Sequence, residues 1–157
     1  MATQGPTRWL TPEEQRHWRA YLRGSRMLVA AMDEALAPYQ LRLSDYEILS
    51  MLSEAPGGRL RMSALAELVV QSRSRVTHTA ARLERLGWVR RSPTPEDRRG
   101  VEVALTPEGL EVLREMAAVH VQSVLDSLVD RLTPEQFRAL GEAMQQVVDA
   151  RDHLPEP

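Results

Sequence analysis

The sequence lacks several residue types, and each absence excludes a class of protein. It contains no cysteine, which rules out disulfides, cysteine-based zinc sites and thiol redox sensing. Aromatic residues make up only 4% of the chain, so the core has to be built from aliphatic side chains. No stretch approaches the roughly 18 apolar residues of a membrane helix, and the first nine residues lack the apolar segment of a secretory signal. We therefore expect a soluble, cytoplasmic protein with no membrane contact.

Lysine is also absent, so all 20 basic residues are arginine. Codon bias in a GC-rich genome accounts for the missing lysine, but it does not explain where the arginines lie. Residues 59–100 hold ten arginines and four acids, a net charge of +6, whereas the whole chain has a net charge of −2. Such a charge separation lets one basic face meet phosphate while the remainder stays acidic. Arginine also suits bidentate contacts to phosphate and guanine.

Threonine followed by proline begins three of the predicted helices, because threonine suits the N-cap and proline the first helical position. Three helix starts also carry the residue that completes a capping box: Thr11 with Glu14, Ser44 with Glu47 and Thr133 with Gln136. We expect Ser63 to cap a further helix. With the apolar spacing, these signals predict helices over 12–37, 45–54, 64–70, 73–86, 107–130 and 134–150, and strands over 88–92 and 101–105.

The order of these elements is that of a winged helix-turn-helix. Two short helices follow each other closely, and a hairpin with a charged tip comes next, all within 59–105. The predicted fold class is mainly α with a small β-wing. We assign 44–105 to a DNA-binding lobe, 11–37 and 106–150 to dimerisation helices, and 1–10 and 152–157 to flexible ends.

The second helix of the motif presents a short, polar and basic face. If Val76, Ala80 and Leu83 are buried, the opposite side carries small and basic side chains that can approach base edges. The predicted DNA contacts of this helix and the adjoining strand are Ser72, Arg73, Ser74, Arg75, Thr77, His78, Arg82 and Arg91. The alternative is a solvated arginine-rich surface, which the adjoining turn and hairpin argue against.

The hairpin tip is also charged. Asp97, Arg98 and Arg99 stand there, and an arginine in this position can enter the minor groove next to the recognition helix. The aspartate can hold the guanidinium in a fixed pose. The alternative is a charged turn that only keeps the hairpin soluble.

Two segments resemble one known family. The run DRRGVxVxLTxxG at 97–109 and the run LERLGWVxR at 83–91 are similar to the wing and recognition-helix signatures of the multiple antibiotic resistance regulator (MarR) family. The resemblance implies an obligate homodimer whose terminal helices interleave. It also implies binding of double-stranded DNA at a pseudo-palindromic operator, usually as a repressor, and release by a small phenolic or anionic effector.

The residues support one part of this picture, the homodimer, independently. Helices 12–37, 107–130 and 134–150 are too apolar on one side to stand free, so isologous pairing of two copies is expected. The resemblance places the effector between the lobe and these helices, where Trp18 and Asp45 are similar to residue types of its urate-responsive branch. Candidate effector residues are His17, Trp18, Tyr21, Asp45, Tyr46 and Met51. The alternative is that they are ordinary packing and helix-start residues.

Catalysis and metal binding find no support in the sequence. The four histidines are dispersed without metal-ligand spacing, and neither a glycine-rich phosphate loop nor a serine nucleophile elbow occurs. We therefore predict no enzyme activity, no metal and no cofactor. A winged helix used for protein contacts alone is the remaining alternative, and the salt dependence of binding to any duplex distinguishes it from a DNA reader.

Overall fold

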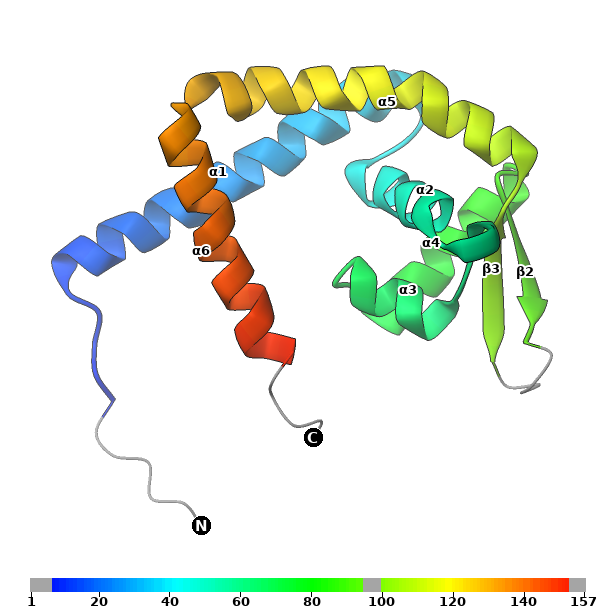
Figure 1. Cartoon of the computed structure of the whole chain (residues 1–157), viewed down its shortest axis with the longest axis horizontal. Coiled ribbons are helices and arrows are strands. Elements are labelled where there is room, and N and C mark those ends of the chain that lie inside the picture. The colour runs from blue at the N-terminus through cyan, green and yellow to red at the C-terminus, as the bar shows by residue number, and fades with distance from the viewer. Residues whose placement is uncertain (1–6, 95–99, 153–157) are drawn as a thin grey trace, which may run out of the picture.

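The computed structural model describes residues 7–94 and 100–152, and within them the chain is mainly helical with one small antiparallel sheet (Figure 1). The helices are α1 (Pro12–Leu36), α2 (Leu43–Glu54), α3 (Met62–Leu68), α4 (Arg73–Arg85), α5 (Pro107–Ser127) and α6 (Pro134–Asp152). The strands are β1 (Arg59–Arg61), β2 (Val89–Pro93) and β3 (Val101–Leu105). The predicted fold class is confirmed. None of the described helices combines the length and hydrophobicity of a bilayer span.

The two longest helices form a frame, and the remaining elements form a lobe at one end of it. α1 and α5 run side by side, while α2, α3, α4 and the sheet gather at the start of α5 (Figure 1). The N-terminal half of α1 extends away from the lobe, and α6 turns steeply off the far end of α5 (Figure 1). The assignment of the lobe to DNA binding and of the terminal helices to dimerisation stays a prediction.

Two of the three predicted capping boxes are confirmed. At the start of α1, Glu14 N donates to Thr11 Oγ1 over 3.2 Å and Thr11 N donates to Glu14 Oε2 over 2.8 Å. At the start of α6, Thr133 and Gln136 exchange the same pair of bonds at 3.2 Å and 3.0 Å. These bonds satisfy amide groups that have no partner inside the helix.

The prediction for the start of α2 was wrong. The helix begins at Leu43 with Arg42 as its N-cap residue, so Ser44 already lies inside the first turn. The Asp45 carboxylate accepts from Arg42 N over 2.8 Å, and Asp33 of α1 accepts from Leu43 N over 2.7 Å. An aspartate from another helix therefore contributes to the cap, which local sequence spacing does not reveal.

The start of α3 also differs from the prediction, because an unpredicted strand precedes it. β1 pairs antiparallel with β3, so that Arg59 lies opposite Ala104 and Leu60 opposite Val103, and the strand order is β1-β3-β2. The strand runs directly into α3, whose N-cap residue is Arg61, so Ser63 lies within the helix instead of capping it. Three residues are too few to show a strand period in the sequence.

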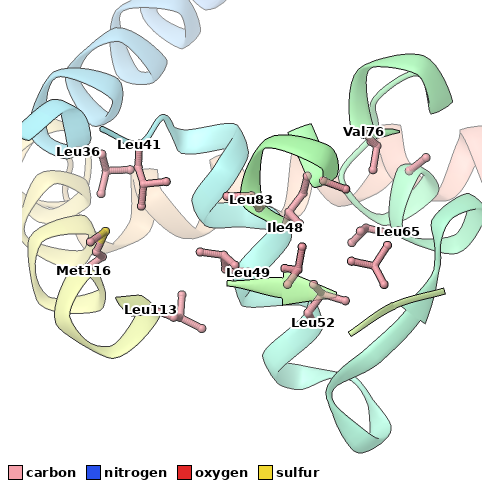
Figure 2. Close-up of a cluster of buried hydrophobic side chains, with 14 residues drawn as sticks. Leu36, Leu41, Ile48, Leu49, Leu52, Leu65, Val76, Leu83, Leu113 and Met116 are labelled. Carbon is pink, nitrogen blue, oxygen red and sulfur yellow. The ribbon is translucent and has the colours of Figure 1, made fainter. Parts of the chain in front are cut away.

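One aliphatic core joins the lobe to the frame. Ile48, Leu49 and Leu52 of α2 occupy its centre, and residues from both the sheet and the long helices close it (Figure 2). Its fully buried large side chains are Leu36, Leu41, Ile48, Leu49, Leu52, Leu65, Val76, Leu83 and Val103. Leu113 and Met116 of α5 also belong to the cluster. Because Leu36 and α5 belong to the frame, this core fixes the lobe relative to it.

A tight junction connects the end of α4 to the start of α5. Gly87 has φ +79°, and Trp88 N donates to Leu83 O over 3.0 Å while Gly87 N donates to Glu84 O over 2.9 Å, the pattern of a Schellman helix end. The Thr106 hydroxyl then donates to Gly87 O over 2.7 Å. The end of α4 and the start of the long helix α5 are thus hydrogen-bonded to each other.

Candidate nucleic-acid interface

The first turn of α4 lies at the surface and carries polar side chains. A turn with Val70 at φ +50° separates α3 from α4, and Ser72 Oγ accepts from Arg75 N over 3.3 Å as the N-cap. The inner side of α4 packs through Val76, Ala80 and Leu83, all fully buried. Apolar burial on one side therefore orients the opposite side of the helix toward solvent.

The predicted DNA contacts in the first half of α4 lie together on this exposed side: Ser72, Arg73, Ser74, Arg75, Thr77 and His78. Among the described residues, neither Arg73 nor Arg75 takes part in an ion pair. Both guanidinium groups therefore keep their donors for an outside partner. The free amides at the helix start add a favourable position for phosphate.

Arg82 has a different environment from the other predicted contacts. Its guanidinium forms an ion pair with Asp45 at the start of α2 and donates to Gln40 O over 3.4 Å. The Asp45 side chain is only 3% exposed and that of Arg82 is 32% exposed. The structure thus brings a predicted DNA contact together with a predicted effector residue, and this pair holds α4 against α2.

Arg91 is likewise engaged within the lobe. Its Nε donates to Glu84 Oε2 over 2.8 Å, and its backbone N donates to Glu84 Oε1 over 2.8 Å. These hydrogen bonds hold the pKa of the Glu84 carboxyl below its ordinary value, with the backbone bond as the largest contribution. The first wing strand is therefore tied to the last turn of α4.

The described part of the wing is a regular hairpin. β2 and β3 pair from Val89 opposite Leu105 to Pro93 opposite Val101, and Thr94 N donates to Gly100 O over 2.9 Å. The predicted tip contacts Asp97, Arg98 and Arg99 lie outside the described residues. The hairpin begins beside the end of α4, so both predicted DNA-contacting elements belong to the same lobe.

The six candidate effector residues fall into two groups. His17, Trp18 and Tyr21 lie exposed in the first half of α1, with the Trp18 and Tyr21 rings stacked at 5.9 Å. The other three, Asp45, Tyr46 and Met51, lie on α2. Trp18 and Leu36 are about 27 Å apart along α1 at 1.5 Å per residue, and α2 follows the far end of that helix (Figure 1). One copy of the chain does not bring the two groups together.

A histidine that was not among the candidates contacts one of them. The His120 ring of α5 stacks on the Tyr46 ring of α2 with centroids 4.2 Å apart, and His120 Nδ1 is buried without a hydrogen-bond partner in the described structure. Burial lowers the pKa of His120 and raises the pKa of Tyr46, to which the Glu54 charge also contributes. The sequence signal for this contact was a histidine among the apolar residues of the predicted helix 107–130. The stack lies where the lobe meets the frame.

Comparisons with known proteins agree with this geometry. A family model described as MarR family matches residues 39–100. AbsC, a MarR family transcriptional regulator from Streptomyces coelicolor, is 41% identical with a TM-score of 0.86, over 94% of this chain and all of that one. Sco3205 from the same organism, solved in complex with DNA, is 44% identical with a TM-score of 0.88, over 94% of this chain and 92% of that one.

A further relative has a lower sequence identity to this chain. PecS of Dickeya dadantii (strain 3937), an HTH-type transcriptional regulator, is 32% identical over 108 residues, which are 68% of this chain and 64% of PecS. These relatives are named as transcriptional regulators and not as enzymes. The fold, the exposed polar start of α4 and these similarities lead to one conclusion: the chain belongs to the MarR family of DNA-binding transcriptional regulators.

Proposed function

We propose that two copies of the chain form a homodimer that binds a pseudo-palindromic operator and represses the adjoining genes. The observation that carries the proposal is the exposed, polar and basic surface at the start of α4, with Arg73 and Arg75 free of ion pairs within the described structure. In this role the first half of α4 enters the major groove. The arginines contact guanine or phosphate, and the small serine and threonine side chains allow close approach.

The apolar surface of the terminal helices supports the homodimer. Trp18 is 50%, Tyr21 45% and Val147 63% exposed in the single chain, although each belongs to an apolar helix face. Further large apolar side chains exposed on the same helices are Met27, Val29, Val121, Phe137 and Val148. Burying them against a second copy removes this surface from water. A two-fold axis through the frame would then place two α4 helices one DNA turn apart, about 34 Å.

We further propose that a small aromatic anion weakens DNA binding. Support comes from the position of the Tyr46–His120 stack and the Asp45–Arg82 pair, which both lie where α2 meets another element. A ligand that changes the Tyr46–His120 stack shifts the lobe relative to the frame, whereas a ligand that changes the Asp45–Arg82 pair moves α4 within the lobe. Either change alters how the two α4 helices are placed. Ligand control of this kind requires different affinities for the two arrangements.

The experiment that tests DNA binding is operator selection from genomic DNA, followed by titration at several salt concentrations. The logarithm of the affinity is expected to fall linearly with that of the salt concentration, because each phosphate contact releases counterions. Arg73→Ala and Arg75→Ala should each weaken binding by about 1–3 kcal/mol. Arg114→Ala is the matched control, because Arg114 is an exposed arginine on α5 whose guanidinium pairs with Glu111.

Two results would contradict the proposal. A salt-independent affinity would favour a winged helix used for protein contacts alone. If the wild-type protein is a monomer in solution, binding of a homodimer to a two-fold symmetric operator is excluded. For the effector, the operator complex is titrated with hydroxybenzoates and with unsubstituted benzoate, and release by none of these aromatic anions would count against this class of ligand.

A further inference from the structure

One face of the three-stranded sheet points away from the core of the lobe. Leu60, Val89 and Val103, one on each strand, belong to the core or pack against it. Side chains alternate between the two faces along a strand, and residues paired across strands share a face. The alternate residues therefore form the opposite side, which we call the outer sheet face. It consists of Arg59, Arg61, Arg90, Ser92, Glu102 and Ala104.

The outer sheet face has a positive net charge, because its three arginines are all exposed and it holds only one acid. Arg59 Nη1 lies 3.4 Å from Glu102 Oε1, and the Arg59 side chain remains 59% exposed. Arg90 takes part in no ion pair among residues 7–94 and 100–152. A single carboxylate does not neutralise three guanidinium groups, so the face attracts anions.

Arg59 and Arg90 lie on either side of a small residue. Both are paired with Ala104, one from each neighbouring strand, so their Cα atoms are about 10 Å apart across the sheet. The Ala104 methyl group leaves the space between the two long side chains open. Two guanidinium groups in this arrangement can bind the same phosphate or two neighbouring phosphates of a DNA strand, because arginine forms bidentate hydrogen bonds to phosphate oxygens.

The position of the sheet in the molecule favours DNA as the source of these phosphates. The sheet lies at the end of the lobe farthest from α6 (Figure 1). In the proposed homodimer, whose axis passes through the frame, the two sheets therefore lie at the outer ends of the complex, beyond both α4 helices. DNA that leaves each half-site passes this position. The outer sheet face also carries three of the ten arginines of the basic segment 59–100, which α4 and the wing tip do not account for.

We infer that the outer sheet face binds the phosphate backbone of the DNA that flanks each half-site, through Arg59 and Arg90. The inference rests on the proposed operator binding and adds a contact surface to it, separate from α4 and from the wing tip. The pair of arginines lies two residues, about 7 Å, farther from the wing tip than Glu102 does. The flanking duplex therefore bends toward the lobe to reach both arginines, and the phosphate contacts offset the cost of that bend.

The test compares two duplexes in anisotropy titrations of the full chain. One duplex ends at the outer edges of the selected operator, and the other extends it at both ends by about one helical turn, roughly 10 base pairs, of unrelated sequence. The wild-type protein should bind the extended duplex about tenfold more tightly at low salt. Its logarithmic salt dependence should also be steeper by about 3 to 4, since two arginines in each of two copies add four phosphate contacts at about 0.9 each.

Three double variants assign this gain to the outer sheet face. Arg59→Ala with Arg90→Ala should abolish the gain and the additional salt dependence, while binding of the short duplex stays close to that of the wild-type protein. Arg59→Lys with Arg90→Lys should retain most of the gain, because lysine also binds phosphate. The matched control is Arg16→Ala with Arg23→Ala, which removes the same charge from two exposed arginines of α1 and should leave the gain intact.

Hydroxyl-radical footprinting on the extended duplex locates the contact. With the wild-type protein, sugars beyond each half-site should be protected from cleavage. The protection beyond the half-sites should be lost with Arg59→Ala and Arg90→Ala combined, whereas protection within the half-sites should remain.

The outcomes separate this inference from the proposed function. If the wild-type protein binds neither duplex, both are overturned. If it binds the operator but gains nothing from the extension, or if the alanine variant keeps the gain, only the contact of the outer sheet face is overturned; an acidic protein as the partner of this face would give that result. If the alanine variant loses its helical circular dichroism, the wild-type gain and the wild-type footprint beyond the half-sites decide the question.

Discussion

Asp45 and Arg82 form an ion pair that joins the start of α2 to the recognition helix α4. Asp45 also accepts from Arg42 N over 2.8 Å, so a single carboxylate caps one helix and anchors another. The aspartate is almost fully buried, and a buried carboxylate without a partner is costly. The pair therefore holds the position of α4, and the Arg82 guanidinium is already engaged within the chain.

The first prediction concerns this pair. Arg82→Ala should lower the free energy of unfolding by about 2–3 kcal/mol, less than for a fully buried pair because Arg82 is partly exposed. Urea denaturation measures the loss. The double variant with Asp45→Asn should be less destabilised than the sum of the two single variants, since each single variant leaves one charge without its partner and the double variant does not. If Arg82→Ala and the wild-type protein have equal free energies of unfolding, the ion pair does not stabilise the fold.

The second prediction concerns the junction between α4 and α5. A Cβ on Gly109 would lie 2.1 Å from Trp88 O and 2.9 Å from a Leu105 methyl, and a backbone oxygen cannot move aside cheaply. Gly109→Ala should therefore lower the free energy of unfolding by about 3 kcal/mol. Gly141→Ala is the control, because a Cβ there meets nothing within 4 Å and alanine favours the helix by up to about 1 kcal/mol. Thermal melts of both variants make the comparison, and equal melting temperatures would contradict it.

The third prediction concerns pH. Burial lowers the pKa of His120 in the folded chain, so the unfolded chain binds the proton more readily. The stabilisation from neutral His120 is fully present above its ordinary pKa of about 6.5 and is lost as the pH falls from there to the lower pKa of the folded chain. His120→Gln should remove this part of the pH dependence. Urea midpoints at about pH 7.5 and pH 5.5 for both proteins provide the measurement, and an unchanged difference would rule out His120 as its source.

The fourth prediction concerns the wing tip. Arg98→Ala should weaken operator binding by about 1–3 kcal/mol, the scale of one arginine contact to DNA, while leaving the free energy of unfolding unchanged. A gel-shift titration measures the affinity, and Arg114→Ala again serves as the control. Equal affinity of Arg98→Ala and the wild-type protein would remove the wing tip from DNA recognition.

Local signals in the sequence were sufficient for the order of the helices and of the β2–β3 hairpin. Threonine at the N-caps of α1, α5 and α6, the glycine that ends α4 and the change from helical to strand spacing after it all act over a few residues. The basic character of 59–100 also follows from the sequence, because the net charge of a segment is the sum over its residues, whatever they contact. These features led to the winged fold and to the exposed face of α4.

Features that depend on distant residues were decided only by the tertiary structure. β1 exists because Leu60 pairs with Val103, 43 positions later in the chain. Arg82 was predicted to contact DNA, yet it pairs with Asp45, and His120 stacks on Tyr46 across the boundary of lobe and frame. A local pattern shows which side of a helix is polar, whereas packing determines which polar side chain finds a buried partner. The sequence by itself thus determined the helices, the wing and the charge of the surface, and the tertiary structure decided which of those charges are already paired within the chain.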